Sequence, residues 1–238
     1  VHNSNSASAE YMESIWNKAE NLGMNTLLVP VTWEMTEPEE GVFDFQLVDS
    51  LIAQALERGK KLILLWFGSW KNAQCYYAPS WVKTNLGRFR RAEIEKGKNL
   101  IKLSEFYDID YTSLSYLCNE TKKADANAFS KLLAHIRDID EEHQTVIMVQ
   151  VENETGIMGS AREHSDLADQ IFAQTGPEKF VNYMRSHTDS MEKDVRSEVM
   201  HGTEKGSWKE VFGEAAEEIF STYHIASYVN YVAEAGKR

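Results

Sequence analysis

Apolar positions follow a repeating order along this chain: an amphipathic helix, a short loop and a short apolar run. The predicted helices cover residues 11–22, 47–56 and 129–139, and the apolar runs after them cover residues 26–31, 62–67 and 146–151. Apolar residues recur every three or four positions in each helix, which places them on one face. Gly23 and Gly59 are predicted to end the first two helices. Pro30 is an irregularity in the first strand, because proline cannot donate to a sheet.

Helix and strand units in series predict a parallel sheet with helices outside it. The run 146–151 is mostly apolar, which predicts a strand buried on both faces. A further amphipathic helix is predicted around residues 229–233. Residues 235–238, which follow it, resemble residues 57–60, which precede the strand at 62–67. We therefore predict an α/β fold in which residues 1–238 are the N-terminal portion of one barrel, a partial (β/α)8 TIM barrel truncated at both ends, because such barrels typically need about 250 residues. The alternative is a complete small doubly wound domain.

Two long segments lie between the repeats, at residues 69–125 and 155–207. Both follow the carboxyl end of a predicted strand. Loops longer than about 15 residues are usually functional or carry secondary structure of their own. We expect both segments to border the site that the strand ends build.

Residues able to bind or react follow each predicted strand end. They are His2, Asn3 and Ser4, then Trp33, Glu34 and Glu37, then Trp70, Lys71 and Asn72, and last Glu152, Asn153 and Glu154. The carboxyl ends of parallel strands meet at one rim, where α/β folds place their chemistry. Carboxylates can act as general acid, base or nucleophile. Amides and lysine can bind hydroxyl groups, and an indole offers a sugar a flat apolar face.

Most of these residues also have a purely structural interpretation. Trp33 and Trp70 can be rim packing, and Lys71 and Asn72 can be surface residues of a loop. Glu37 fits an ordinary turn acid, which is the interpretation that we favour for it.

The acids after the run 146–151 are the most informative group. Glu152 and Glu154 are two positions apart, so strict strand alternation puts both on one face and does not choose between them. An acidic loop behind a core strand is the structural alternative. Asn153 directly before Glu154 favours a functional polar cluster.

The composition narrows the kind of partner and site. Asp and Glu number 37 against 25 Lys and Arg, a net charge of −12, which argues against nucleic acid and is compatible with a neutral substrate such as a sugar. No apolar run approaches the about 20 residues of a membrane span. Cys75 and Cys118 lack metal-ligand spacing, and no His pair at helical spacing accompanies the acids, so we expect no metal. The chain also lacks a Gly-rich phosphate loop and a serine nucleophile elbow.

Several segments resemble glycoside hydrolase family 35, and in particular its bacterial β-galactosidases. The segments are residues 150–156 around Asn153-Glu154, residues 33–45, and residues 65–72 with 77–83. That family belongs to the clan of retaining (β/α)8 enzymes whose acid/base Glu follows an Asn. Many members have Ala-Glu-Trp at the end of the third strand, with this Glu on a galactose hydroxyl. Here the place is taken by Gly68-Ser69-Trp70, so the reaction type is implied more firmly than the galactose preference.

The resemblance assigns roles to the strand-end residues. It implies that Glu154 is the general acid/base, with a raised pKa, and that Asn153 binds the sugar hydroxyl next to the reacting carbon. A sugar-binding subsite would be formed by Trp33, Glu34, Trp70, Lys71 and Asn72. The nucleophile would be a second Glu from a later strand, beyond the end of residues 1–238.

The implied function is that of a retaining glycoside hydrolase that releases terminal β-galactose from galactosides or plant-type oligo- and polysaccharides. Its partner is the carbohydrate, it needs no cofactor, and a periplasmic or secreted location is favoured. One alternative is another clan member, such as an endo-β-glucanase or a mannanase. The other is a carbohydrate-binding barrel without catalysis. Residues 1–238 alone are expected to have little activity, because the nucleophile lies outside them.

Overall fold

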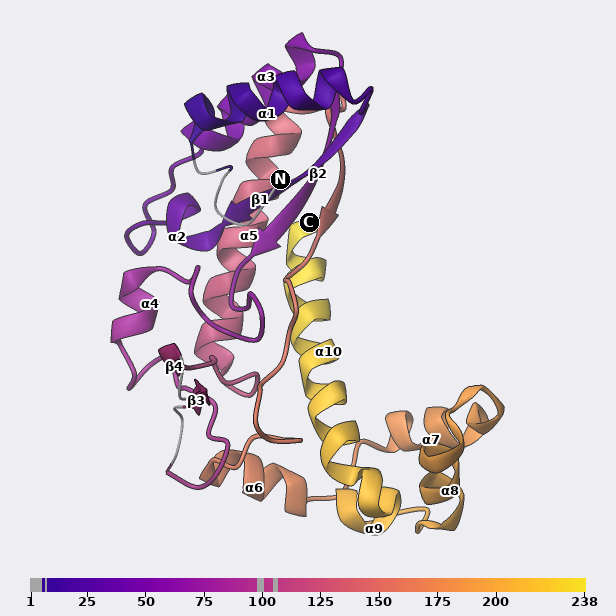
Figure 1. Ribbon diagram of the computed structural model, residues 1–238. Coiled ribbons are helices and arrows are strands. Elements are labelled where there is room, and N and C mark those ends of the chain that lie inside the picture. Colours follow the sequence, from indigo (N-terminus) through magenta and orange to yellow (C-terminus); the bar gives the residue numbers. More distant parts are fainter. Residues whose placement is uncertain (1–5, 7, 98–100, 105–106) are drawn as a thin grey trace. The chain divides into compact units, whose positions relative to one another are not determined.

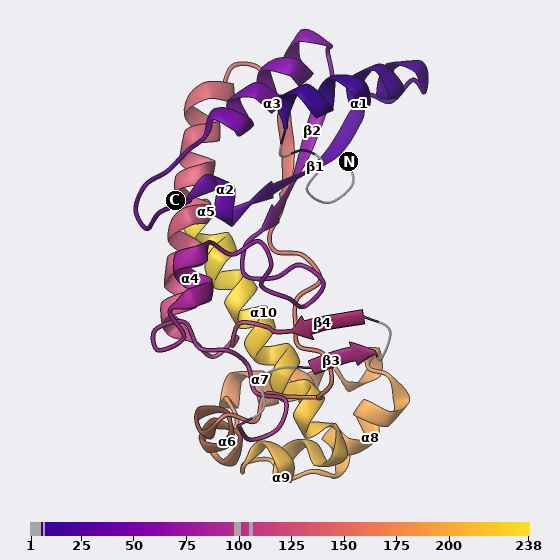
Figure 2. The ribbon, with the colours of Figure 1, turned by 60° about the vertical axis from the view of Figure 1, so that its left-hand side comes forward.

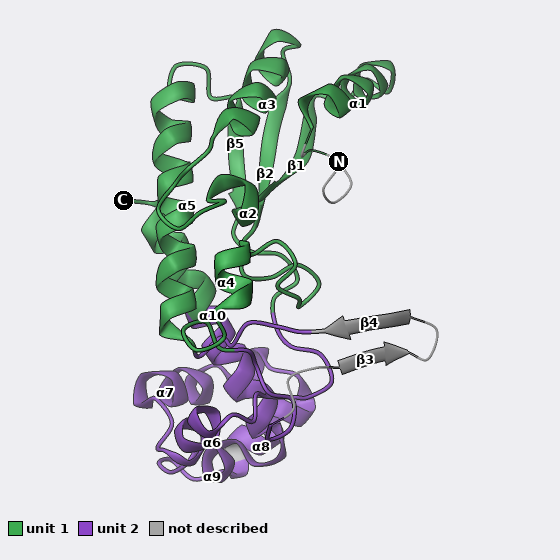
Figure 3. Ribbon diagram, turned by 90° about the vertical axis from the view of Figure 1, so that its left-hand side faces the viewer, with its two compact units in different colours: residues 1–90, 118–155, 228–238 green, residues 91–117, 156–227 purple. Residues whose placement is uncertain are grey.

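The computed structural model describes residue 6 and residues 8–97, 101–104 and 107–238. The chain forms two compact units, shown in different colours in Figure 3. Unit 1 consists of residues 1–90, 118–155 and 228–238, and unit 2 of residues 91–117 and 156–227. The predicted strand end at His2, Asn3 and Ser4 lies outside the described residues. The repeat that predicted a barrel falls in unit 1, and most of unit 2 falls in the two long segments after the strands.

Unit 1 is built on a three-stranded parallel sheet (Figure 1). Its elements are α1 (Ala9–Asn21), β1 (Thr26–Thr32), α2 (Trp33–Thr36), α3 (Gln46–Glu57), β2 (Lys61–Phe67), α4 (Ser80–Thr84), α5 (Asn119–Asp140) and β5 (Val146–Gln150). The strand order is β1-β2-β5. Parallel neighbours joined through helices confirm the α/β prediction.

The ends of α1 and α3 are stabilised by local chemistry, and Gly23 and Gly59 end these helices as predicted. Ser8 caps α1 by accepting a hydrogen bond from the backbone N–H of Tyr11. Gly23 and Gly59 follow α1 and α3 with φ of 67° and 60°, a left-handed conformation that glycine adopts without a Cβ clash. Pro30 is tolerated in β1 because β1 is an edge strand.

One face of the sheet is buried beneath α5. The alternating residues Leu62, Leu64 and Trp66 of β2 are at most 1% exposed. The Trp66 ring lies 5.7 Å from that of Phe129 on α5. This face also fixes the position of the carboxyl end of β2, from which the loop with Lys71 departs.

The prediction that residues 146–151 form a strand buried on both faces is wrong in this structure. β5 is the edge of the sheet beside β2, and Ile147 and Met148 are 52% and 60% exposed. The apolar character of the segment was interpreted as burial, whereas every residue of β5 is partly or fully exposed among the described residues.

Unit 2 is mainly helical. It contains β3 (Ile101–Ser104), β4 (Tyr107–Tyr111), α6 (Asp166–Ala173), α7 (Glu178–Ser186), α8 (Lys193–His201), α9 (Trp208–Phe212) and short 3₁₀ turns at Thr188–Ser190 and Gly213–Ala215. α10 (Ala216–Gly236) belongs to unit 2 up to residue 227 and to unit 1 from residue 228. Its last turns run beside α5 (Figure 2). The expectation that the long segments carry elements of their own is confirmed. None of the described helices is long and apolar enough to cross a membrane.

Candidate active site

The chain turns sharply where β5 ends, and this turn separates the two acids. Glu152 and Glu154 have φ of 64° and 49°, a left-handed conformation that is uncommon for residues other than glycine. Glu152 is 2% exposed, whereas the side chain of Glu154 is 60% exposed. The expectation from strict alternation, that both lie on one face, is therefore wrong, because the extended conformation ends at Gln150.

Glu154 lies in a cluster with Asn153, Lys71 and Asn72. Its Oε2 is 2.5 Å from Lys71 Nζ and accepts a hydrogen bond of 2.9 Å from Asn153 Nδ2. Lys71 Nζ also donates to Asn72 Oδ1. The backbone N–H of Ala73 donates to the carbonyl of Glu154 at 2.7 Å. The structure thus brings together four of the predicted site residues from the ends of β2 and β5.

The orientation of Asn153 is set by a residue that the sequence did not single out. Gln150 Nε2 donates to Asn153 Oδ1 at 3.1 Å and to the carbonyl of Glu152 at 3.0 Å. With its oxygen held by Gln150, the Asn153 amide presents its nitrogen to Glu154.

Lys71 also decides the protonation of Glu154. The pKa of the Glu154 carboxyl is lowered from its ordinary value of 4.5, chiefly by the hydrogen bond from Lys71, with Asn153 adding to the effect. This differs from the raised pKa expected of a general acid, because the site places the ammonium group of Lys71 against the carboxylate.

The two indoles predicted to bind sugar have no exposed face. Trp33 and Trp70 are both 0% exposed. Trp33 packs edge-on against Trp81 with ring centroids 5.7 Å apart, and Trp70 packs against Tyr228 at 4.6 Å. Both tryptophans therefore pack in the interior in this structure, as the structural interpretation of these residues expected.

Glu37 is a structural acid of the turn after α2, in agreement with the favoured interpretation, and it is also buried, which the sequence did not indicate. Its Oε2 accepts from Trp33 Nε1 and its Oε1 from the backbone N–H of Gly41, both at 2.8 Å. Burial raises the pKa of Glu37, and these two bonds oppose the rise. Glu37 fixes α2 and the loop that follows it.

Glu34 forms an ion pair with Lys83 and not with the residues of the Lys71 cluster. Its Oε2 is 3.1 Å from Lys83 Nζ of α4, and its backbone N–H donates to the carbonyl of Tyr77 at 2.9 Å. Lys83 Nζ also donates to the carbonyl of Tyr76 at 2.8 Å. Glu34 and Lys83 are both partly exposed and form a second charged pair behind the strand ends.

A buried acidic pair, Asp125 with Glu152, was missed from the sequence. Asp125 lies on α5 and is 0% exposed, and its Oδ2 accepts a hydrogen bond of 2.6 Å from Ser69 Oγ. A usable signal was present. Asp125 stands four residues from both Thr121 and Phe129, on the buried face of an amphipathic helix, where an acid needs a partner.

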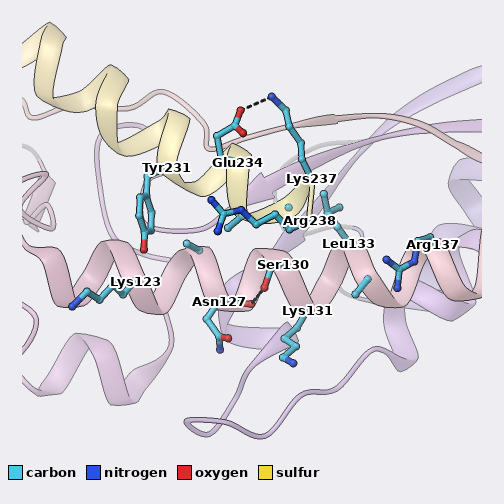
Figure 4. Close-up of a pocket in the computed structure, with 14 residues that line it drawn as sticks. Lys123, Asn127, Ser130, Lys131, Leu133, Arg137, Tyr231, Glu234, Lys237 and Arg238 are labelled. Atoms are coloured by element: carbon cyan, nitrogen blue, oxygen red, sulfur yellow. Dashed lines mark hydrogen bonds and ion pairs between the residues drawn. The ribbon is translucent and has the colours of Figure 1, made fainter.

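A cavity of about 610 Å³ lies between α5 and the end of α10 (Figure 4). Its walls carry the cationic residues Lys123, Lys131, Arg137, Lys237 and Arg238. Tyr231 and the ion-paired Glu234 come from α10. No predicted site residue lines it. Among the described residues, no group of three or more His, Cys, Asp or Glu side chains could hold a metal ion, and Cys75 and Cys118 are buried thiols that form no disulfide.

Comparison with known proteins identifies the family. The family model of the glycoside hydrolase family 42 β-galactosidases matches residues 2–201. This chain belongs to that family. The resemblance to family 35 named the right kind of enzyme and the wrong family, and the assignment to family 35 is not supported. No curated protein matches the chain.

Solved structures agree on the fold. A β-galactosidase from Bacillus circulans sp. alkalophilus matches with a TM-score of 0.61 and 15% identity over 100% of this chain and 34% of its own. A β-galactosidase from the psychrophilic Marinomonas ef1 matches with a TM-score of 0.56 and 12% identity over 98% of this chain and 33% of its own. The catalytic domain of a β-amylase from Paenibacillus polymyxa matches with a TM-score of 0.53 and 13% identity over 99% of this chain and 60% of its own.

These likenesses confirm the α/β fold as that of part of a glycoside hydrolase TIM barrel. The chain spans about a third of the length of the β-galactosidases that it resembles. The family and fold are therefore established for residues 1–238, and the activity of the whole protein is a matter for proposal.

Proposed function

We propose that the protein carrying this chain is a retaining β-galactosidase in which Glu154 is the general acid/base. The observation that carries the proposal is the position of Glu154, an exposed carboxylate next to Asn153 at the carboxyl end of a parallel strand in a family 42 chain. Barrel enzymes build their sites at that end of the strands. Glu154 would protonate the leaving oxygen and then activate water.

Asn153 supports this role through its hydrogen bonds. Gln150 holds its amide oxygen, and its Nδ2 is 2.9 Å from Glu154 Oε2. In this orientation the amide can reach a sugar hydroxyl beside the carbon that reacts, a contact that strengthens in an oxocarbenium-like transition state. Lys71 and Asn72 line the same cluster and would bind further hydroxyl groups.

The contact with Lys71 must change during the reaction. A general acid works best with its pKa near the operating pH, whereas Lys71 lowers the pKa of Glu154. A second carboxylate near the cluster would draw Lys71 away or offset its charge, and a retaining site has such a carboxylate roughly 5–5.5 Å from the acid/base. We propose that Lys71 exchanges Glu154 for that nucleophile or for the substrate.

No residue of 1–238 is proposed as the nucleophile. Glu152 is buried and its oxygens are occupied by the backbone N–H groups of Ser69 and Trp70. Glu34 is paired with Lys83. We therefore propose that the nucleophile is a Glu supplied by another part of the protein, as the sequence resemblance implied.

For the substrate we propose terminal β-galactose, with no cofactor and no nucleic acid partner. The family match favours this over the internal bonds that endo-glucanases and mannanases cleave. Binding without turnover is a second candidate, and the ion pair between Lys71 and Glu154 favours it, because a permanently anionic Glu154 could accept hydrogen bonds from a sugar and could not protonate a leaving group.

The test compares Glu154→Ala with the wild type in the full protein that carries this chain. We expect hydrolysis of an aryl β-galactoside to fall by at least about 10²-fold, the lower end of general acid–base contributions. Azide should restore turnover and give a β-galactosyl azide, as retention requires. Glu57→Gln is the control, because Glu57 is an exposed Glu of α3. Undiminished hydrolysis in Glu154→Ala would overturn the assignment, and tight galactose binding without any wild-type turnover would favour the binding protein.

A further inference from the structure

Two carboxyl groups are hydrogen-bonded to each other in the interior of unit 1, and neither takes part in the proposed chemistry. Asp125 and Glu152 are 0% and 2% exposed. Within the part of the chain that the structure describes, no cationic side chain is among the groups that shift the pKa of Glu152. Two buried carboxylates in contact repel each other strongly, so such a pair normally keeps one proton.

The hydrogen bonds show which member keeps the charge. Asp125 accepts from Trp66 Nε1 at 2.9 Å, from Ser69 Oγ at 2.6 Å and from the backbone N–H of Ser69 at 3.2 Å, and Tyr228 Oη lies 3.2 Å from it. Glu152 accepts only two backbone N–H groups, from Ser69 at 3.3 Å and Trp70 at 3.0 Å. Asp125 accepts more hydrogen bonds than Glu152, so we assign the shared proton to Glu152.

The pair joins three segments of unit 1. Asp125 comes from α5, Glu152 follows β5, and Ser69 and Trp70 follow β2. Gly68 is part of the fit, because a Cβ there would lie 2.6 Å from Glu152 Oε1 and 2.7 Å from Asp125 Oδ1. A substituent at residue 68 would displace the two carboxyl groups.

The Lys71–Glu154 contact lies between two backbone attachments. On one side, Trp70 N–H binds the Glu152 carboxyl at 3.0 Å. On the other, Ala73 N–H binds the Glu154 carbonyl at 2.7 Å. Lys71 follows Trp70 directly, and Glu154 comes two residues after Glu152. The hydrogen bond between the Trp70 N–H and the buried Glu152 carboxyl therefore helps to set the position of Lys71 relative to Glu154.

We propose that Asp125 and a protonated Glu152 form a positioning pair that holds Lys71 and Asn72 against Glu154. The proposal rests on the proposed function of Glu154, since it assigns the pair a role at that site. Neither member touches substrate, and both act through the loop after β2.

The groups around Asp125 and Glu152 support the inference that the two carboxyl groups share one proton. Tyr228 reaches the pair from α10, and burial, followed by the charge of Asp125, raises the pKa of the Tyr228 hydroxyl well above its ordinary value. Glu37 repels Asp125 electrostatically. Burial, followed by the Asp125 charge, raises the pKa of Glu152 well above its ordinary value of 4.5. Ionising Glu152 would add a second negative charge beside these groups and weaken the attachment of the loop.

The first test measures the proton. An infrared difference spectrum of wild type minus Glu152→Gln at pH 7 should contain the C=O stretch of one protonated carboxylic acid. Glu152→Gln can still donate to Asp125 and accept from the backbone N–H of Trp70, and it gives up only the longer bond of 3.3 Å from the backbone N–H of Ser69. Absence of that band at pH 7 would overturn the shared proton and with it the proposal.

The second test measures positioning, by NMR titration of the Glu154 carboxyl. Glu152→Ala should raise the pKa of Glu154 toward the value found in Lys71→Met, while Glu152→Gln should leave it at the wild-type value. If Glu152→Ala does not fold, Glu152→Asp replaces it, because the shorter side chain cannot reach both backbone N–H groups. A folded variant with the wild-type pKa of Glu154 would show that the pair has no positioning role. Neither test needs turnover, so failure here is distinct from failure of Glu154 as acid/base.

Discussion

Lys71 Nζ lies 2.5 Å from Glu154 Oε2, and the two residues arrive at this contact from the ends of different strands. Lys71 follows β2 and Glu154 follows β5. The ammonium side chain is only 14% exposed, while the carboxylate is 60% exposed. The largely buried cation therefore lowers the pKa of an exposed carboxyl group that follows the end of β5.

Removing the cation should raise the pKa of Glu154. In Lys71→Met the largest cause of the lowered pKa is gone, so a ¹³C NMR titration of the Glu154 carboxyl should move upward. In the active enzyme the alkaline limb of the kcat/KM profile should move the same way, because the acid stays protonated to higher pH. Lys83→Met is the control, since Lys83 pairs with Glu34. An unchanged titration in Lys71→Met would contradict the contact.

Gly68→Ala should be strongly destabilising. Its Cβ would lie 2.4 Å from Trp66 Nε1 and 2.6 Å from Glu152 Oε1, among side chains that are fully buried. Overpacking of this kind costs about 1–3 kcal/mol or more in the free energy of unfolding. Gly87→Ala is the matched control, because its nearest neighbour would be 3.9 Å away. Urea denaturation of both variants measures the difference, and equal midpoints would show that the close approach at residue 68 is not real.

Glu152 should make stability depend on pH. Its folded pKa is raised above the unfolded value, so its contribution is fully present below about pH 4.5 and is lost as the pH rises toward the folded pKa. Glu152→Gln removes this loss. The difference in unfolding free energy, variant minus wild type, should therefore increase with pH over that window. A difference that stays flat from pH 4 to 8 would contradict a buried, protonated Glu152.

Glu37→Gln should destabilise the protein, although Glu37 is outside the proposed chemistry. The carboxylate accepts from both Trp33 Nε1 and Gly41 N–H, and an amide can accept only one while its NH₂ group faces the other donor. A buried donor without a partner costs about 1–3 kcal/mol. Thermal unfolding should show a lower Tm than Glu39→Gln, whose side chain is exposed. The same Tm in both variants would show that the hydrogen bonds of Glu37 do not contribute to the free energy of unfolding.

The sequence predicted the parts of this molecule that depend on local pattern. Helical periodicity and apolar runs located α1, β1, α3, β2, α5 and β5 within a few residues, except that α5 begins ten residues before the predicted start, at Asn119. Strand ends in a parallel sheet necessarily meet, so the cluster of Lys71, Asn72, Asn153 and Glu154 could also be predicted.

What the sequence missed depends on backbone turns and long-range partners. Positive φ at Glu152 and Glu154 sends one acid inward and the other outward, and alternation cannot anticipate that. Asp125 lies 27 positions before Glu152 and meets it only through tertiary packing. Trp33 and Trp70 have the composition of sugar-binding residues, yet their rings are covered by Trp81 and Tyr228.

Azide rescue of Glu154→Ala in the full protein is the decisive experiment for the proposal that Glu154 is the acid/base of a retaining β-galactosidase. We predict slow hydrolysis of a β-galactoside with a poor leaving group and, on an aryl β-galactoside with a good leaving group, rescue by azide with β-galactosyl azide as the product. Wild-type hydrolysis by Glu154→Ala, or an α-configured azide product, would contradict the account.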